Sequence, residues 1–439
     1  MTDESVRQPR HAGWARAYGH PVKAFSGRGE LCFPDSSGHV SFSLVQFGDG
    51  TIRARAVSRT LIRPSHQWSG TLTGTTRDNG QIVVSEVFPT RWEIAQNRVT
   101  TYFIAGGAEV TASAPPSQPS VQRYALTNLI FTGDRQGDRP GCIDLRPVLQ
   151  AWITPAPNMS NVVDEIRAGK GVDVTCVVES HEHCGLSEEE VDDLCLLLSF
   201  SRGTTVSWIY SENVQGGQVL HTKLRAAKTS SLTGPPVIAP DWDTGEFVRK
   251  TAPGFRELKE RFRLRAIVLS YLDAKKEDVY LETRALRAAT TLDLLAGLFA
   301  RLYKREHIVG SAKSKKVEAA VKASLKNMKN LLPEELSELS QKLGEMRKRS
   351  FRRLVTELIE EFRVPPPSPE RDDIIKRVVD TRNRLVHRAE FRTPPPGSAY
   401  PDYAEIMGLL DRIILRMLGY EGRFIDITQL LQPADLVAA

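Results

Sequence analysis

The sequence lacks any run of about 18 apolar residues, so it offers no candidate for a membrane-spanning helix. Its first 20 residues are polar, and we expect no secretory signal there. The five cysteines are few, odd in number and scattered. This usage argues against a disulfide framework and is typical of reduced thiols in a cytoplasmic protein. We therefore expect cytoplasmic localisation and no membrane partner.

Several motifs of common enzymes are also missing. There is no phosphate-cradling glycine loop, no nucleophile elbow and no motif of two catalytic carboxylates. No arrangement of basic and aromatic residues indicates a base-stacking platform. One C-x4-H-x-H-C cluster could supply zinc ligands: Cys176, His181, His183 and Cys184. Its spacing matches no zinc-finger pattern. We predict no metal and no cofactor, with a metal-dependent nuclease at this cluster as a weaker alternative.

What is present is the composition of an ordinary globular protein. The 439 residues are enough for two or three domains, each with its own core. The formal net charge of +6 and the pI near 9.0 permit an anionic partner such as RNA without requiring one.

The N-terminal half has the patterns of β-structure. After a polar tail, residues 1–25, short alternating or β-branched runs at 40–45, 51–57, 81–84 and 99–104 are separated by turn signals. They predict a small antiparallel sandwich or barrel over residues 26–118, ending in a Pro- and Ser-rich linker. Residues 119–240 predict a second β-rich, α+β domain, or the second half of one β-rich module. A helix over 186–199 is expected there, with Ser187 as its cap.

Residues 250–439 have helical periodicity almost throughout. Helices are expected over 254–274, 279–303 and 403–418, with two or three shorter ones between 313 and 364, broken at Pro333 and near Gly344. Five or six helices around one core predict an all-α bundle. The predicted fold class is therefore α+β and multidomain, with a β-rich N-terminal region followed by a helical bundle.

One helix, over residues 370–390, contains the most informative motif. At about 100° per residue, Ile375, Val378, Val379, Leu385 and Val386 form its apolar seam. Arg382 falls inside that seam, where a guanidinium is costly unless it meets an anion or water. His387 lies five residues on, about 140° around the helix, and shares a face with Asn383.

This Arg-Asn-x3-His pattern resembles the R-x(4–6)-H ribonuclease motif of the HEPN superfamily. The segments Tyr-Leu-Glu-Thr-Arg-Ala-Leu at 280–286 and Met-Leu-Gly-Tyr-Glu-Gly at 417–422 are similar to ApeA-like HEPN proteins. The segment at 194–204 resembles the region upstream of such domains. The resemblance covers residues 250–439 well, 120–240 loosely and the first hundred residues hardly at all.

The resemblance implies a metal-independent endoribonuclease. His387 would be the general base or acid, Arg382 the phosphate clamp, and Asn383 would orient the phosphate or His387. Glu282 and Asp293 are supporting candidates, with Asp293 expected to hold Arg382. Asp293 is shorter than the acidic residue that related sequences often have at this position. Helix-face basic residues are the candidates for RNA backbone contact: Arg384, Arg388, Lys348, Arg349, Arg352 and Arg353.

The resemblance also implies a homodimer, because two copies of this helix around a twofold axis would pool these side chains in one cleft. The expected role is phage defence or a toxin-like effector. The N-terminal region would sense a phage-derived or protein trigger, position RNA or restrain the nuclease. The alternative is a non-catalytic dimerisation or binding module, with ligand or protein recognition by the β-rich region.

Overall fold

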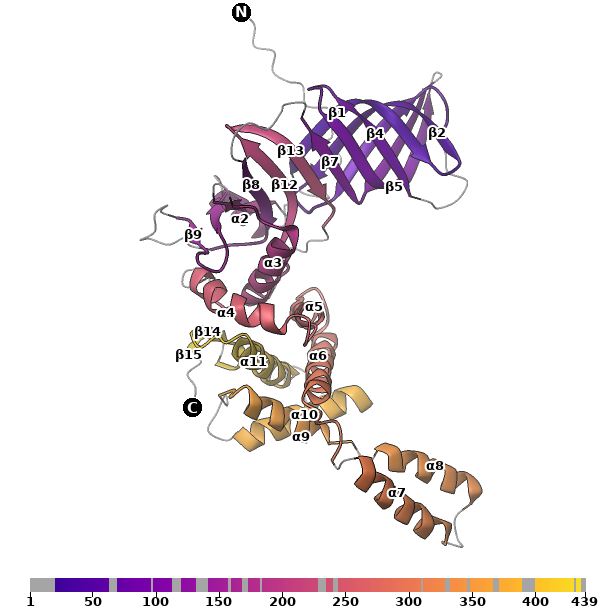
Figure 1. The fold of residues 1–439 in the computed structure, drawn as a ribbon, viewed down its shortest axis with the longest axis vertical. Helices are drawn as coiled ribbons and strands as arrows, with labels where there is room; N and C mark the ends of the chain where they lie inside the picture. Colours follow the sequence, from indigo (N-terminus) through magenta and orange to yellow (C-terminus); the bar gives the residue numbers. More distant parts are fainter. Residues whose placement is uncertain are drawn as a thin grey trace, which may run out of the picture. The chain divides into compact units, whose positions relative to one another are not determined.

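The computed structural model describes most of the chain between residues 20 and 435. A large antiparallel sheet occupies the N-terminal half and helices most of the C-terminal half, so the chain is α+β (Figure 1). It divides into two compact units, Met1–Ala252 and Pro253–Ala439. The described residues are 20–62, 69–95, 98–112, 120–131, 141–156, 159–167, 173–181, 184–227, 234–239, 244–308, 311–327, 332–345, 348–365, 371–388, 399–429 and 432–435.

Six strands of the first unit close into a ring. Their order is β4-β1-β2-β3-β6-β5, and β4 also pairs with β5. Side chains alternate between the two faces of each strand, and the inward set forms one apolar core that includes Leu44, Leu72 and Phe103. The strands are β1 (Pro21–Phe33), β2 (Ser36–Phe47), β3 (Ile52–Ser58), β4 (Gly70–Thr76), β5 (Gln81–Ala95) and β6 (Arg98–Ala105).

The predicted tail, residues 1–25, overlaps this ring. Residues 1–19 lie outside the described part of the chain, and β1 already begins at Pro21, where its backbone pairs with β2. The end of the predicted tail is therefore strand. The sequence of β1 gives little sign of a strand, because it lacks apolar alternation. Many of its side chains are only half-buried, so no such alternation is needed.

The sheet continues beyond the predicted linker. Strand β7 pairs with both β5 and β13, so residues 26–118 and 119–240 share one sheet. From β7 the order is β13-β12-β8-β11-β10-β9. The strands are β7 (Gly107–Thr111), β8 (Ser120–Thr127), β9 (Ile143–Asp144), β10 (Ala151–Pro155), β11 (Val174–Ser180), β12 (Ser207–Gln215) and β13 (Gln218–Arg225).

Two helices accompany this part of the sheet, α2 (Met159–Arg167) and α3 (Glu188–Arg202). The predicted cap of α3 is confirmed. The Ser187 hydroxyl accepts a hydrogen bond from the Glu190 amide at 3.2 Å, and the Glu190 carboxylate accepts one from the Ser187 amide at 2.9 Å. This reciprocal pair satisfies two amides that the first helical turn leaves without partners. The helix ends at Gly203, whose φ of 66° is readily adopted by glycine.

The second unit is mostly helical and is organised around α6. Alanines along α6, among them Ala285, Ala288 and Ala289, are fully buried and let neighbouring helices approach closely. The helix packs against α5, α9, α10 and α11. Helix α4 (Thr244–Leu258) crosses the boundary between the two units. The described helices of the second unit that follow it are α5 (Leu264–Lys275), α6 (Leu281–Leu302), α7 (Ser311–Lys326), α8 (Pro333–Glu345), α9 (Phe351–Glu361), α10 (Arg371–Arg388) and α11 (Ala399–Met417).

Helices α6, α10 and α11 follow the expected positions closely. The single helix expected over 254–274 is wrong, because α4 ends at Leu258 and α5 begins at Leu264 after a turn. The predicted break at Pro333 is the first residue of α8, and the break near Gly344 falls at its end. A short hairpin after α11, formed by β14 (Arg423–Asp426) and β15 (Gln432–Asp435), was not anticipated. None of the described helices combines the length and the apolar composition that crossing a membrane requires.

Candidate active site

The motif helix is α10, and its predicted seam is largely buried. Ile375, Val378, Val379 and Leu385 are at most 7% exposed. Val386 was expected in the seam as well, but it is 40% exposed. It lies four residues after Arg382 on the same side of the helix, where neighbouring helices no longer cover α10. The seam therefore opens toward solvent one turn beyond Arg382, whose own side chain is 18% exposed.

Arg382 meets a carboxylate at this open end. Its Nε lies 3.0 Å from Oδ1 and 2.9 Å from Oδ2 of Asp293 on α6, and its Nη2 lies 2.5 Å from Oδ2. The two side chains are 18% and 28% exposed. A paired guanidinium at a partly open position avoids the cost of burying an isolated charge.

Two further contacts fix the guanidinium. Its carbon lies 4.8 Å from the centre of the Phe351 ring, at the first position of α9, and Nη1 donates to Oδ1 of Asn383 at 2.9 Å. A guanidinium has five N–H groups, and these contacts engage three of them. Among the described residues, the other two N–H groups meet no acceptor, and their planar arrangement suits a phosphate. Phe351 did not stand out in the sequence, although an aromatic residue directly after a cap and inside a basic run is a usable signal.

Asn383 and His387 are exposed on the surface of α10. His387 lies five positions after Arg382, which corresponds to about 7.5 Å along the axis and about 140° around it. The helix thus presents the guanidinium and the imidazole in different directions. One chain alone does not direct both groups at one phosphate through this helix.

Glu282 is not brought to this site. It lies in the exposed first turn of α6, eleven residues before Asp293, which is about 16 Å along the helix axis. Of the two predicted supporting acids, only Asp293 contacts Arg382. The resemblance favoured Asp293 as the partner of Arg382, and the contact agrees with that expectation.

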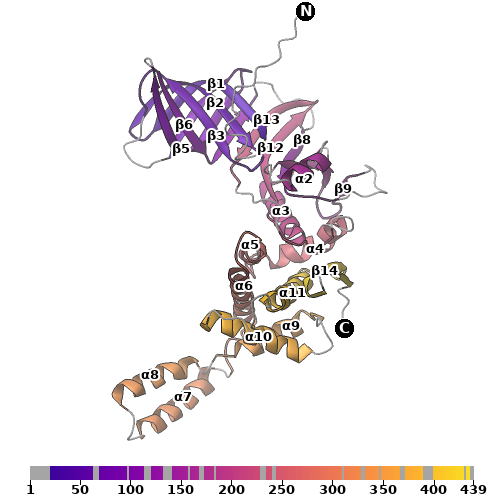
Figure 2. The same ribbon diagram turned by 180° about the vertical axis from the view of Figure 1, so that it is seen from behind.

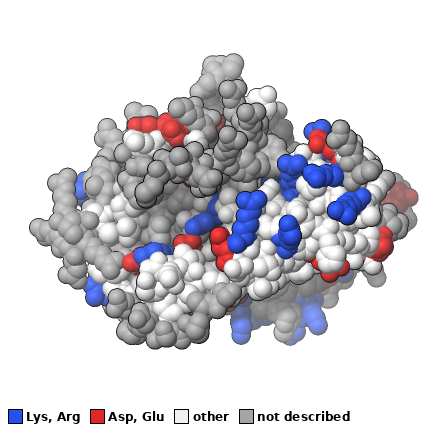
Figure 3. All heavy atoms as spheres, turned by 90° about the horizontal axis from the view of Figure 1, so that it is seen from above, with Lys and Arg blue, Asp and Glu red and all other residues white. Residues whose placement is uncertain are grey.

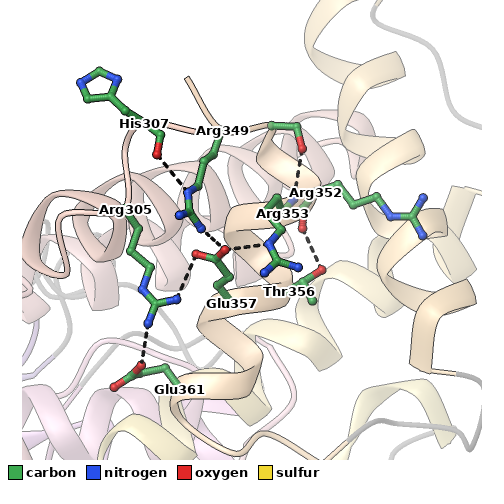
Figure 4. A network of polar contacts seen from close by, with 9 residues as sticks. Arg305, His307, Arg349, Arg352, Arg353, Thr356, Glu357 and Glu361 are labelled. Carbon is green, nitrogen blue, oxygen red and sulfur yellow. Dashed lines mark hydrogen bonds and ion pairs between the residues drawn. The ribbon is translucent and has the colours of Figure 1, made fainter. Parts of the chain in front are cut away.

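Two of the predicted RNA-binding residues near α9, Arg349 and Arg353, contact the buried acid Glu357 (Figure 4). Glu357 Oε1 accepts hydrogen bonds from Nε of Arg353 at 2.7 Å and from Nη1 of Arg349, and Oε2 accepts one from Arg305 at 3.4 Å. Burial opposes ionisation of Glu357, but the hydrogen bond from Arg353 and the charges of Arg349, Arg353 and Arg305 outweigh it. The pKa of Glu357 is therefore lowered.

This network changes how the basic run is interpreted. Arg349 and Arg353 hold Glu357 in place, and Arg349 also donates to the backbone oxygen of His307 at 3.2 Å. Lys348, Arg352 and Arg384 are exposed on the surface. Arg388 ends α10, and its side chain lies outside the described part of the structure. Phe351 lies inside the same run and stacks on Arg382, so the two groups of charges are neighbours.

The cysteine and histidine cluster has a different local structure. Cys176 is buried in β11, where its Sγ donates to the backbone oxygen of Leu129 at 3.1 Å and burial raises its pKa. His181 Nδ1 accepts a hydrogen bond from the Trp152 indole at 3.2 Å, and His183 lies outside the described residues. Within the described residues, no group of three or more His, Cys, Asp or Glu side chains is arranged to hold a metal ion.

Comparisons of the chain with protein families, curated proteins and solved structures returned no match. The residues of α6, α9 and α10 and their contacts are therefore the features that indicate a function.

Proposed function

We propose that the chain is a metal-independent endoribonuclease of the HEPN type, with its active site on α10. The observation that carries this proposal is the Arg382 guanidinium. It is held at the open end of an apolar seam by Asp293 and Phe351, with two N–H groups left for a ligand. Such a group suits the nonbridging oxygens of a phosphodiester.

In the proposed reaction the 2′-oxygen of the RNA attacks the adjacent phosphorus, and the bond to the 5′-oxygen breaks. The proton of the 2′-hydroxyl goes to a base, and a proton returns to the leaving 5′-oxygen. His387 serves as base or acid, because a neutral imidazole accepts and releases protons near neutral pH. Arg382 offsets the negative charge that grows on the phosphoryl oxygens. The products are a 2′,3′-cyclic phosphate, or a 3′-phosphate after hydrolysis, and a 5′-hydroxyl.

The proposal includes a homodimer. Since one copy of α10 directs Arg382 and His387 about 140° apart, a second copy related by a twofold axis supplies a convergent pair. In its cellular role the enzyme acts as an antiviral or toxin-like effector in the cytoplasm. The N-terminal sheet then receives a trigger, positions RNA or restrains the nuclease.

A second candidate is a non-catalytic binding module. It is favoured by the same ion pair, because Asp293 already neutralises Arg382 without any ligand. An arginine that only joins two helices would have this geometry too.

Purified protein incubated with total RNA in the presence of a chelator distinguishes the two candidates. We expect cleavage by the wild-type chain and a loss of about 100-fold or more in His387→Ala, the usual effect of removing a general acid or base. Lys376→Ala is the matched control, since Lys376 is an exposed cation on the same helix outside the site. Intact RNA with all three proteins would favour the binding module.

A further inference from the structure

Three neighbouring strands of the ring carry arginine and aromatic side chains in register. Arg55 of β3 is opposite Tyr102 of β6, and Tyr102 is opposite Arg91 of β5. Two residues along, Arg53 is opposite Ile104, and Ile104 is opposite Phe88. The strands lie side by side in Figure 2. We call this set the arginine–aromatic face: Arg53, Arg55, Phe88, Arg91, Tyr102 and Ile104.

These six side chains lie on the outside of the ring. Their neighbours along the strands, such as Ile52, Ala54 and Phe103, are buried in the core, and alternation places the next residue on the opposite face. Phe88 is 41% and Ile104 39% exposed. Exposed apolar groups clustered in this way mark a binding surface.

The aromatic ring at the centre of the face is held in place. The guanidinium carbon of Arg91 lies 6.0 Å from the centre of the Tyr102 ring, and the Tyr102 hydroxyl donates to Glu93 at 3.0 Å. Glu93 also pairs with Arg91 at 2.6 Å. A ring held by such contacts loses little freedom when a ligand stacks on the face.

The charge on the face favours an anionic ligand. Its three arginines face two nearby acids, Glu93 and Asp49, the second of which interacts electrostatically with Arg53. Arg55 is exposed and interacts electrostatically with Tyr102. Figure 3, a view from above, shows several Lys and Arg side chains among mostly uncharged ones, with fewer acidic side chains between them.

We propose that the arginine–aromatic face binds single-stranded RNA. Exposed aromatic rings accept unpaired bases by stacking, and arginines beside them contact the phosphates. This combination is tolerant of sequence and sensitive to salt. The proposal goes beyond the cleavage site, because the face belongs to the first compact unit and binds RNA whether or not α10 cleaves it.

The test uses the full chain with His387→Ala, so that bound RNA stays intact. Fluorescence anisotropy measures its affinity for a labelled oligouridine of about 20 nucleotides. Arg55→Glu with Arg91→Glu should weaken binding at least tenfold and flatten its salt dependence. Phe88→Ser should weaken it about 5- to 100-fold, the range for losing one stacked base.

Arg77→Glu is the matched control, because Arg77 is an exposed arginine in the turn between β4 and β5. It should bind like the parent, and a duplex of the same length should compete poorly. Should the charge reversals unfold the ring, Arg55→Gln with Arg91→Gln provides a milder pair. Absence of binding by the parent, or equal affinity in the parent and in folded face variants, would overturn the proposal and leave the face to a protein partner. A failure of the proposed cleavage appears separately, as intact RNA with His387 present.

Discussion

Arg382 of α10 and Asp293 of α6 form an ion pair in which both carboxylate oxygens accept from the guanidinium, at 2.5 to 3.0 Å. The pair resolves the apparent conflict of a cation inside an apolar seam. Together with the Phe351 ring, whose centre lies 4.8 Å from the guanidinium carbon, the ion pair sets the direction of the guanidinium. We interpret Asp293 as a positioning residue that acts through Arg382.

Replacing Asp293 by Asn should lower the kcat of RNA cleavage by about 10- to 100-fold, because a misplaced catalytic group has effects of this size. The KM should change less, since exposed basic residues still attract RNA. Asp293→Glu should restore most of the rate, because it keeps the charge that orients Arg382. Steady-state kinetics on a short RNA measure both parameters.

Glu282→Gln serves as the comparison for that series. Glu282 lies on the same helix about 16 Å from Asp293, and its replacement should leave kcat unchanged. An equal loss of rate in the Glu282 and Asp293 variants would show that α6 is merely sensitive to the removal of any acid.

Glu357→Gln should reduce the free energy of unfolding by roughly 1 to 3 kcal/mol, because hydrogen bonds to a charged group contribute about that much. The lowered pKa of Glu357 fixes the pH dependence. Its contribution is fully present above the ordinary value of 4.5 and is lost as the pH falls through the lower pKa of the folded chain. Denaturant titrations should therefore give a constant difference between wild type and variant near neutral pH. The difference in free energy of unfolding should shrink in acid. A difference that grows below pH 4.5 would contradict this prediction.

Helices α7 and α8 should be dispensable for folding. None of their described side chains is buried. At their base, His307 and Lys348 form a β-bridge, and the Arg349 amide donates to Glu306 at 3.0 Å. Replacing residues 309–346 by a short Gly and Ser linker should therefore leave the melting temperature within a few degrees of wild type. A cooperative loss of the whole helical unit in calorimetry would show that this prediction is wrong.

Local patterns predicted much of the fold. The capping box at Ser187 identified α3, and apolar periodicity located α6 and α10, because these signals depend on neighbours within a few residues. In the site, helical periodicity placed Arg382 in its seam, and the family resemblance suggested Asp293 as its partner. The unexpected exposure of Val386 depends on where other helices stop covering α10, which the sequence of α10 alone does not determine.

The features that the sequence missed all involve distant partners. Arg349 and Arg353 seemed equivalent to Arg352 until the buried Glu357 distinguished them. The arginine–aromatic face joins residues 53, 55, 88, 91, 102 and 104 through the register of three strands. A shift by one residue would send those side chains to the opposite face, so only the pairing itself reveals the face.

The most direct measurement of the central claim is the chemistry of the RNA ends. Total RNA treated with the wild-type chain in chelator should yield fragments with a 2′,3′-cyclic phosphate or 3′-phosphate and a 5′-hydroxyl. A 2′-deoxy substitution at a mapped cleavage site should abolish cutting there. Arg382→Ala and His387→Ala should produce none of these ends. Fragments that carry 5′-phosphates, or identical fragments from all three proteins, would contradict the account.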